Sequence, residues 1–135
     1  MLKNKAVTLM ELSVVSIIIG VLATIGIGYF YPSKERTLDR EAQANLRLII
    51  AAERIFRMEG GSYYDSGTVQ PTATTNINTN LRLVLSSSNW NYLTKAIVGP
   101  PVACCAQATR VNGSDSRTWR INYPAETDPQ PLSCP

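Results

Sequence analysis

A single carboxylate, that of Glu11, stands at the head of a long apolar run in the chain. The next charged residue is Lys34, and the residues between them are mostly Leu, Ile, Val, Ala, Gly, Tyr and Phe. An ionised carboxylate that lies alone in lipid costs a few kcal/mol, so such residues are usually paired and functional. The position of Glu11 therefore needs an explanation.

The three cysteines, Cys104, Cys105 and Cys134, are the second set of reactive side chains. They contain no CxxC pair, so neither a zinc ribbon nor a thioredoxin-like motif is supported. If this part of the chain lies outside the cytoplasm, we expect one disulfide. Adjacent cysteines rarely bridge each other, so Cys134 would pair with Cys104 or Cys105 and close a loop of roughly 30 residues. The alternative is three buried thiols in a reducing compartment.

The chain contains no histidine, which is the commonest general base and the commonest metal ligand. Ser-His-Asp catalysis, Cys-His catalysis and ordinary zinc enzymes are therefore excluded. Because no paired-carboxylate motif is present either, we expect no catalytic residue, no cofactor-binding residue and no enzyme activity. The formal net charge of +3 includes Lys3 and Lys5 and is too small to indicate a nucleic-acid partner.

The elements that position these residues begin with the apolar run. Its length of about 20 residues, over 12–31, matches one membrane-spanning helix. Lys3 and Lys5 precede it, so the amino terminus is expected in the cytoplasm and the rest outside, as a single-pass inner-membrane protein. The competing interpretation is a secretory signal that is cleaved near the small residues at 26–28.

A second helical segment follows over residues 33–59, where Pro32 either breaks the helix or bends it. Gly60 and Gly61 are expected to end this helix. Its predicted apolar face consists of Leu38, Ala42, Ile49, Ala52 and Phe56. The opposite face carries a basic stripe of Arg36, Arg40, Arg47, Arg54 and Arg57, which we interpret as solvated.

The remaining residues predict a small β domain. Residues 62–80 are rich in Ser, Thr, Asn and Gly and read as a surface loop. Three segments, 89–98, 102–111 and 117–124, have strand character, and Asn112-Gly113 predicts a hairpin between the last two. The expected fold is α+β, with a long N-terminal helix packed on an antiparallel sheet of three or four strands. The proline-rich tail would be pinned through Cys134.

The first thirty residues resemble the N-terminal signature of type IV pilins and type II secretion pseudopilins. In that signature a short basic leader and a small residue precede a hydrophobic first residue, Thr-Leu and a glutamate. Here these would be leader 1–6 ending in Ala6, then Val7 and Glu11, with Gly20 where the family usually has a glycine. The family normally has glycine where this chain has Ala6. The resemblance divides the chain into the leader 1–6, a transmembrane and assembly helix 7–32, an amphipathic helix 33–60 and a small β domain 61–135.

The resemblance implies a structural function. A prepilin peptidase would remove the leader and N-methylate Val7, and an assembly platform protein would build the homo-oligomeric filament through the apolar helices. Glu11 would then pair with the amine of Val7, either in its own subunit or in a neighbour. A pilus, a secretion pseudopilus and a competence filament share this helix and differ in the machine that assembles them.

Two other interpretations stay open on the sequence. The first is a membrane-tethered binding module for glycan or peptide, in which Tyr63, Tyr64, Trp90 and Trp119 would stack on the ligand. We expect Trp90 and Trp119 to lie in the sheet core instead. The second is calcium, which some major pseudopilins bind in their C-terminal loops. The candidate ligands are Asp115, Glu126 and Asp128, although they lack EF-hand spacing.

Overall fold

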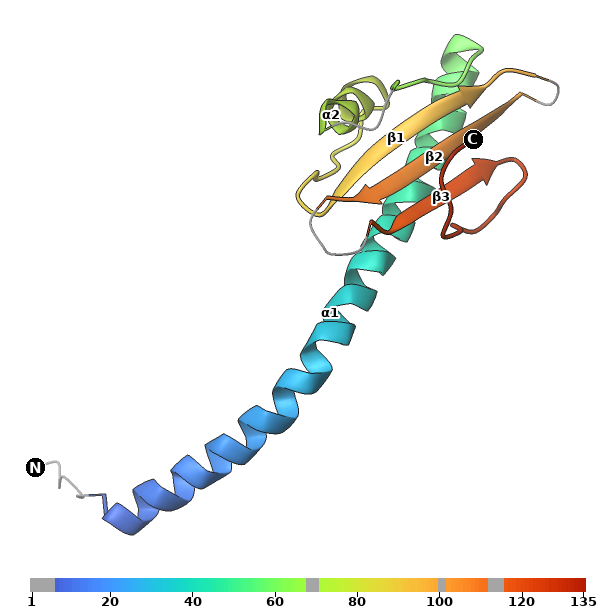
Figure 1. Cartoon of the computed structure of the whole chain (residues 1–135). Helices are drawn as coiled ribbons and strands as arrows, with labels where there is room; N and C mark the ends of the chain where they lie inside the picture. Colours follow the sequence, from blue (N-terminus) through green and yellow to red (C-terminus); the bar gives the residue numbers. More distant parts are fainter. Residues whose placement is uncertain (1–6, 68–70, 100–101, 112–115) are drawn as a thin grey trace, which may run out of the picture. The chain divides into compact units, whose positions relative to one another are not determined.

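The structure is a computed structural model that describes residues 7–67, 71–99, 102–111 and 116–135. The side chains of residues 26–31 and 71 are not described. The chain divides into two compact units, Met1–Thr37 and Leu38–Pro135, which are described separately below. Figure 1 labels the helices α1 and α2 and the strands β1, β2 and β3 of the described residues.

Helix α1 extends over Leu9–Gly60 and continues through Pro32. Of the two alternatives for Pro32, a break or a continuing helix, the structure has the continuing helix. The carboxyl end follows the prediction: Gly61 has a φ of 78°, which glycine adopts without steric cost, and its N–H donates to the carbonyl of Arg57 at 2.7 Å.

In the first unit, the apolar side chains of α1 are uncovered. Between residues 7 and 25, each of the large apolar side chains is more than half exposed. Contiguous apolar surface of this kind marks a site of contact with protein or membrane. The expected membrane span includes residues 26–31, whose side chains lie outside the described part of the chain. Among the described residues, no helix is both long enough and apolar enough to cross a membrane.

The second unit contains a three-stranded antiparallel sheet with the order β1-β2-β3. Its strands are β1 (Trp90–Ile97), β2 (Ala103–Arg110) and β3 (Thr118–Tyr123), so the three predicted strands are confirmed. In register, Thr94 faces Ala106, and Ala106 in turn faces Ile121. The predicted hairpin turn at Asn112-Gly113 lies outside the described residues.

The sheet packs against the second half of α1, where the two elements form the main core (Figure 1). The predicted apolar face is confirmed: Leu38, Ala42, Ile49 and Ala52 are buried, and Phe56 packs against them. Trp90 is 1% exposed, so its expected place in the core is confirmed as well. The fold is α+β, as expected.

One expectation about the fold is wrong. Residues 62–80, read as a surface loop, contain a second helix, α2 (Pro71–Asn80), which packs beside β1. Ala73, Thr74 and Ile77 are buried, and the Thr74 hydroxyl accepts the N–H of Tyr92 at 3.0 Å. Tertiary packing therefore makes a helix of a segment whose Thr and Asn residues have low intrinsic helix propensity.

Candidate functional site

The start of α1 is organised by two side chains, Thr8 and Glu11. The Thr8 N–H and hydroxyl both donate to Oε2 of Glu11, at 2.9 and 3.0 Å, and the Glu11 N–H donates to the Thr8 hydroxyl at 3.2 Å. This reciprocal arrangement is a capping box, in which two N–H groups that the helix leaves unpaired are satisfied. Our sequence reading missed it, although the Thr-x-x-Glu spacing is its usual signal.

The cap engages only one oxygen of the Glu11 carboxylate. Oε1 makes no hydrogen bond within the described residues, and the side chain lies on the exposed surface. Glu11 can therefore hold the helix start through Oε2 while Oε1 accepts a cation. The nearest backbone nitrogen before Thr8 belongs to Val7, whose side chain is 70% exposed. Ala6, the other predicted processing residue, lies outside the described residues.

The polar side chains that follow Glu11 are turned back on the helix. The hydroxyls of Ser13, Ser16 and Thr24 donate to the carbonyls of Leu9, Leu12 and Val21 at 2.8–2.9 Å. Such internal bonds remove the need for water at these hydroxyls. From Leu12 to Ile25 the helix therefore presents a surface that suits an apolar environment.

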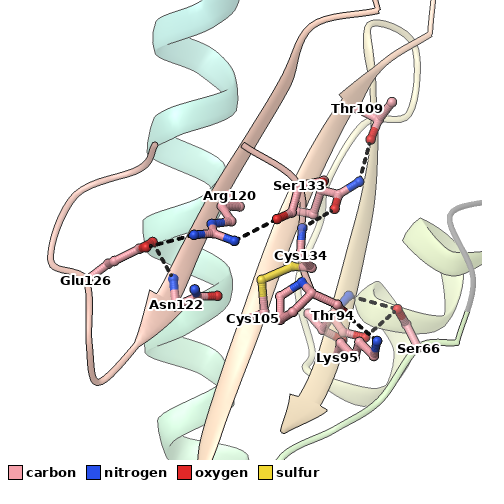
Figure 2. Close-up of a disulfide and its surroundings, with 12 residues drawn as sticks. Ser66, Thr94, Lys95, Cys105, Thr109, Arg120, Asn122, Glu126, Ser133 and Cys134 are labelled. Atoms are coloured by element: carbon pink, nitrogen blue, oxygen red, sulfur yellow. Dashed lines mark hydrogen bonds and ion pairs between the residues drawn. A yellow bond between two sulfur atoms is a disulfide. The ribbon is translucent and has the colours of Figure 1, made fainter. Parts of the chain in front are cut away.

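The predicted disulfide is present and joins Cys105 to Cys134 (Figure 2). Cys104 is a buried free thiol in the core between α1 and the sheet. Successive strand residues point to opposite faces, so Cys105 faces the tail and Cys104 faces the helix. This resolves which of the adjacent cysteines pairs with Cys134.

The tail is fixed by hydrogen bonds as well as by the disulfide (Figure 2). Gln107 of β2 accepts the N–H of Cys134 at 2.7 Å, and Arg120 of β3 donates to the carbonyl of Ser133 at 2.8 Å. Arg120 also exchanges two backbone hydrogen bonds with Gln130, at 2.7 and 2.8 Å. The proline-rich tail is thus a fixed part of the sheet surface.

Two of the three calcium candidates are engaged by arginines. Glu126 accepts from Arg120 at 3.3 Å and from the backbone N–H of Asn122 at 3.0 Å. Asp128 pairs with Arg47 at 2.8 Å. Asp115 lies outside the described residues, and the residues that are described contain no group of three potential metal-ligating side chains.

The basic stripe is exposed, as expected, at Arg36, Arg40, Arg47 and Arg54, and Arg57 is half-buried. Besides the Arg47 pair, Arg54 lies over the ring of Tyr123 at 5.3 Å. Arg57 lies over the ring of Tyr63 at 4.9 Å and donates to its hydroxyl. These cation–π contacts join the second half of α1 to the rest of the second unit.

The aromatic residues of the binding-module interpretation are largely packed. Trp90 and Tyr63 are buried, Tyr64 stacks edge-on against Phe56, and Trp119 directs its indole N–H at Asp39. Trp90 and Tyr63 therefore offer no open ring face for a ligand.

Comparison with known proteins gives a direct indication of family. The chain is 38% identical over 63 residues to the type IV major pilin protein PilA of Myxococcus xanthus strain DK1622. The match covers 47% of this chain and 29% of the length of that pilin. No protein-family model matches the chain, and no solved structure matches it. The similarity to a major pilin supports a pilin-like family for this chain and a structural role.

Proposed function

We propose that the chain is a structural subunit of a type IV pilus-like filament or a type II secretion pseudopilus, assembled through its apolar N-terminal helix. The observation that carries the proposal is the 38% identity to a type IV major pilin. The exposed apolar side chains of residues 7–25 support it, because copies that pack side by side would cover them.

Processing precedes assembly in this proposal. A prepilin peptidase removes residues 1–6 and N-methylates the new amine of Val7. The subunit waits in the inner membrane, with its amino terminus in the cytoplasm and its β domain in the periplasm, until the assembly platform protein inserts it into the filament. The basic residues Lys3 and Lys5 support this orientation. The internally bonded hydroxyls of Ser13 and Ser16 suit an apolar environment.

Glu11 then has two tasks. Oε2 caps the helix through Thr8. Oε1 accepts a hydrogen bond from the positively charged amine of Val7, in the same subunit or in its neighbour. Inside an apolar filament core the pair neutralises both charges. If one partner is removed, the other is left as an uncompensated buried charge, which typically costs about 3–5 kcal/mol.

Three variants separate the two tasks of Glu11. Glu11→Leu removes the charge and the two hydrogen bonds that Oε2 accepts from Thr8, but the Thr8 hydroxyl can still accept the backbone N–H of residue 11. Glu11→Gln keeps the cap, because glutamine also serves in a capping box, but removes the charge. Thr8→Val keeps the charge and removes the cap, which costs the helix about 1 kcal/mol. Each variant is produced in a host that carries the assembly machinery, and filaments are sheared and quantified against the membrane fraction.

We expect Glu11→Gln and Glu11→Leu to accumulate in the membrane and to enter filaments about two to four orders of magnitude less than wild type. Thr8→Val should lower the amount of filament about fivefold, which corresponds to the loss of about 1 kcal/mol. Glu11→Gln filaments at the wild-type level would restrict Glu11 to capping, and absence of wild-type filaments would refute the proposed function. Retraction of the filaments would indicate a pilus, and loss of protein secretion on deletion would indicate a pseudopilus.

A further inference from the structure

Glu53 is a carboxylic acid enclosed in the core of the second unit. Its side chain is 0% exposed, and it is the one charged residue among the buried residues that the structure describes. Oε2 accepts the backbone N–H of Tyr64 at 2.9 Å, whereas Oε1 has no hydrogen-bond partner. The hydroxyl of Thr94, which lies beside the carboxyl group, also lacks a partner. Oε1 of Glu53 and the hydroxyl of Thr94 are therefore buried oxygens of neighbouring side chains, each without a hydrogen-bond partner.

The site is closed on one side by a short stretch of chain, residues 63–67, that we call the docking segment. It leads away from α1 and lies along β1, where Ser66 N–H donates to the Thr94 carbonyl at 2.9 Å. In return, the Thr94 N–H donates to the Ser66 hydroxyl at 2.8 Å (Figure 2). Strands β1 and β2 are held by a continuous ladder. The docking segment belongs to no helix or strand; it is held by Ser66 on β1 and by the packing of Tyr63 and Tyr64 on the core.

No cation balances Glu53. Within the described residues no basic side chain lies in ion-pair distance of it. The titratable groups around it are Asp65 and Tyr64 on the docking segment, Cys104 on β2 and, near that thiol, Arg57 on α1. Burial raises the pKa of Cys104 to about 12, so the thiol stays neutral at physiological pH. The negative charge of Asp65 adds to the cost of ionising Glu53.

We propose that Glu53 is a proton-operated latch for the docking segment. When protonated, the acid donates from Oε1 to the Thr94 hydroxyl and accepts the Tyr64 N–H at Oε2, so both orphaned oxygens are satisfied. When the proton passes to solvent, the carboxylate is left buried with the Tyr64 N–H and the Thr94 hydroxyl as donors and with no cation to balance its charge. A buried charge in that state is strongly unfavourable, and it is relieved when the docking segment lifts and admits water.

The working range of the latch follows from the burial of the acid. Burial raises the pKa of Glu53 to about 7, while the Tyr64 N–H and the Thr94 hydroxyl lower it in part. Once the segment lifts, the acid is solvated and returns toward 4.5. Between these two values the open state gains roughly tenfold in population per pH unit, and above about 7 the gain levels off.

Hydrogen exchange of the full-length chain in neutral detergent tests the latch. Protection of the 63–67 amides, corrected for intrinsic exchange, should fall roughly tenfold per pH unit from pH 5 to 7. At each pH it should stay well below the protection of the β2 amides, which open only with global unfolding. Glu53→Gln should abolish the pH dependence, because the amide can donate to Thr94 and never ionises. The matched control is Glu59→Gln, because Glu59 is an exposed acid on the same helix. This variant should leave the pH dependence of protection unchanged.

A carboxyl-carbon NMR titration reads Glu53 directly and does not depend on any variant. A midpoint near 7 supports the latch, and a midpoint near 4.5 overturns it. The proposal is also overturned if Glu53→Gln retains the pH dependence, or if residues 63–67 and β2 have equal protection at every pH, since the segment would then open only by global unfolding.

Discussion

Cys104 and Cys105 are neighbours in the chain and lie on opposite faces of β2, one against the helix and one bonded to the tail. Exchange of the disulfide from Cys105 to Cys104 would require β2 to rotate or shift by one residue. A one-residue shift would turn every core side chain of the strand outward. The pairing is therefore fixed by the sheet.

Alkylation should reveal this arrangement. We expect no thiol to react in the native chain and one, Cys104, to react after unfolding without reductant. Cys105→Ser should free Cys134 and lower the free energy of unfolding by about 3–4 kcal/mol, from the entropy of the closed loop. Limited proteolysis should then cut the tail first. Recovery of Cys104 in a disulfide would contradict this prediction.

Asp39 is held by two residues of the β domain, and its loss should be measurable. It accepts from Arg117 at 2.9 Å and from the Trp119 indole at 3.4 Å, in a partly buried place. We expect Asp39→Asn to lower the free energy of unfolding by about 1 kcal/mol, since the pair is only partly shielded from water. Chemical denaturation measures this change.

The matched control for Asp39 is Asp128, which pairs with Arg47. In this pair the side chain of Arg47 is 56% exposed and that of Asp128 is 70% exposed. Asp128→Asn should change the free energy of unfolding by less than about 0.5 kcal/mol. Equal effects of the two variants would show that burial does not set the strength of these pairs.

The mature chain should begin at Val7. Intact mass and N-terminal sequencing of membrane-extracted protein should find residues 1–6 removed and one methyl group added. Ala6→Gly, which restores the family's usual residue before the cut, should be processed at least as fast. A mature start near residue 29 would instead indicate an ordinary exported protein.

The stability of the second unit should decrease as pH rises toward neutrality. The folded pKa of Glu53, about 7, lies above the 4.5 of the solvated acid, so the folded state binds more protons between these values. The contribution of protonated Glu53 to the free energy of unfolding is fully present below about pH 4.5 and is lost as pH rises through 7. The loss is on the order of 3 kcal/mol, readable as a lower unfolding temperature at pH 8 than at pH 5.5. Glu53→Gln should flatten this dependence.

Much of the fold follows from hydrophobic periodicity. The buried face of α1 and the three strands were predictable because apolar residues recur there at helical or strand spacing. Helix α2 was not predicted, since Thr and Asn dominate its sequence and its stability comes from packing on β1. Its readable signals were Pro71 at the first helical position and the i, i+4 pair Ala73 and Ile77.

The candidate site was predictable only in part. Glu11 stands out because a charge in an apolar run is rare. Its capping box also depends on Thr8, which is uncharged and does not interrupt the apolar pattern. Glu53 was overlooked because a glutamate on a helix is usually solvated. Its position four residues after Ile49, on the apolar face, was the signal. Strand β2 departs from alternation for a related reason: residues 104–108 are all buried, because the helix covers one face and the tail reaches the other.

The two outer strands of the sheet are also covered along their free edges. On β1, Thr74 accepts the Tyr92 N–H, and Ser66 occupies both backbone groups of Thr94. On β3, Gln130 occupies both backbone groups of Arg120. Exposed strand edges are templates for uncontrolled pairing between chains. Copies of this protein crowded together would have to displace these contacts before their sheets could join, which protects a concentrated pool of subunits from amyloid-like aggregation.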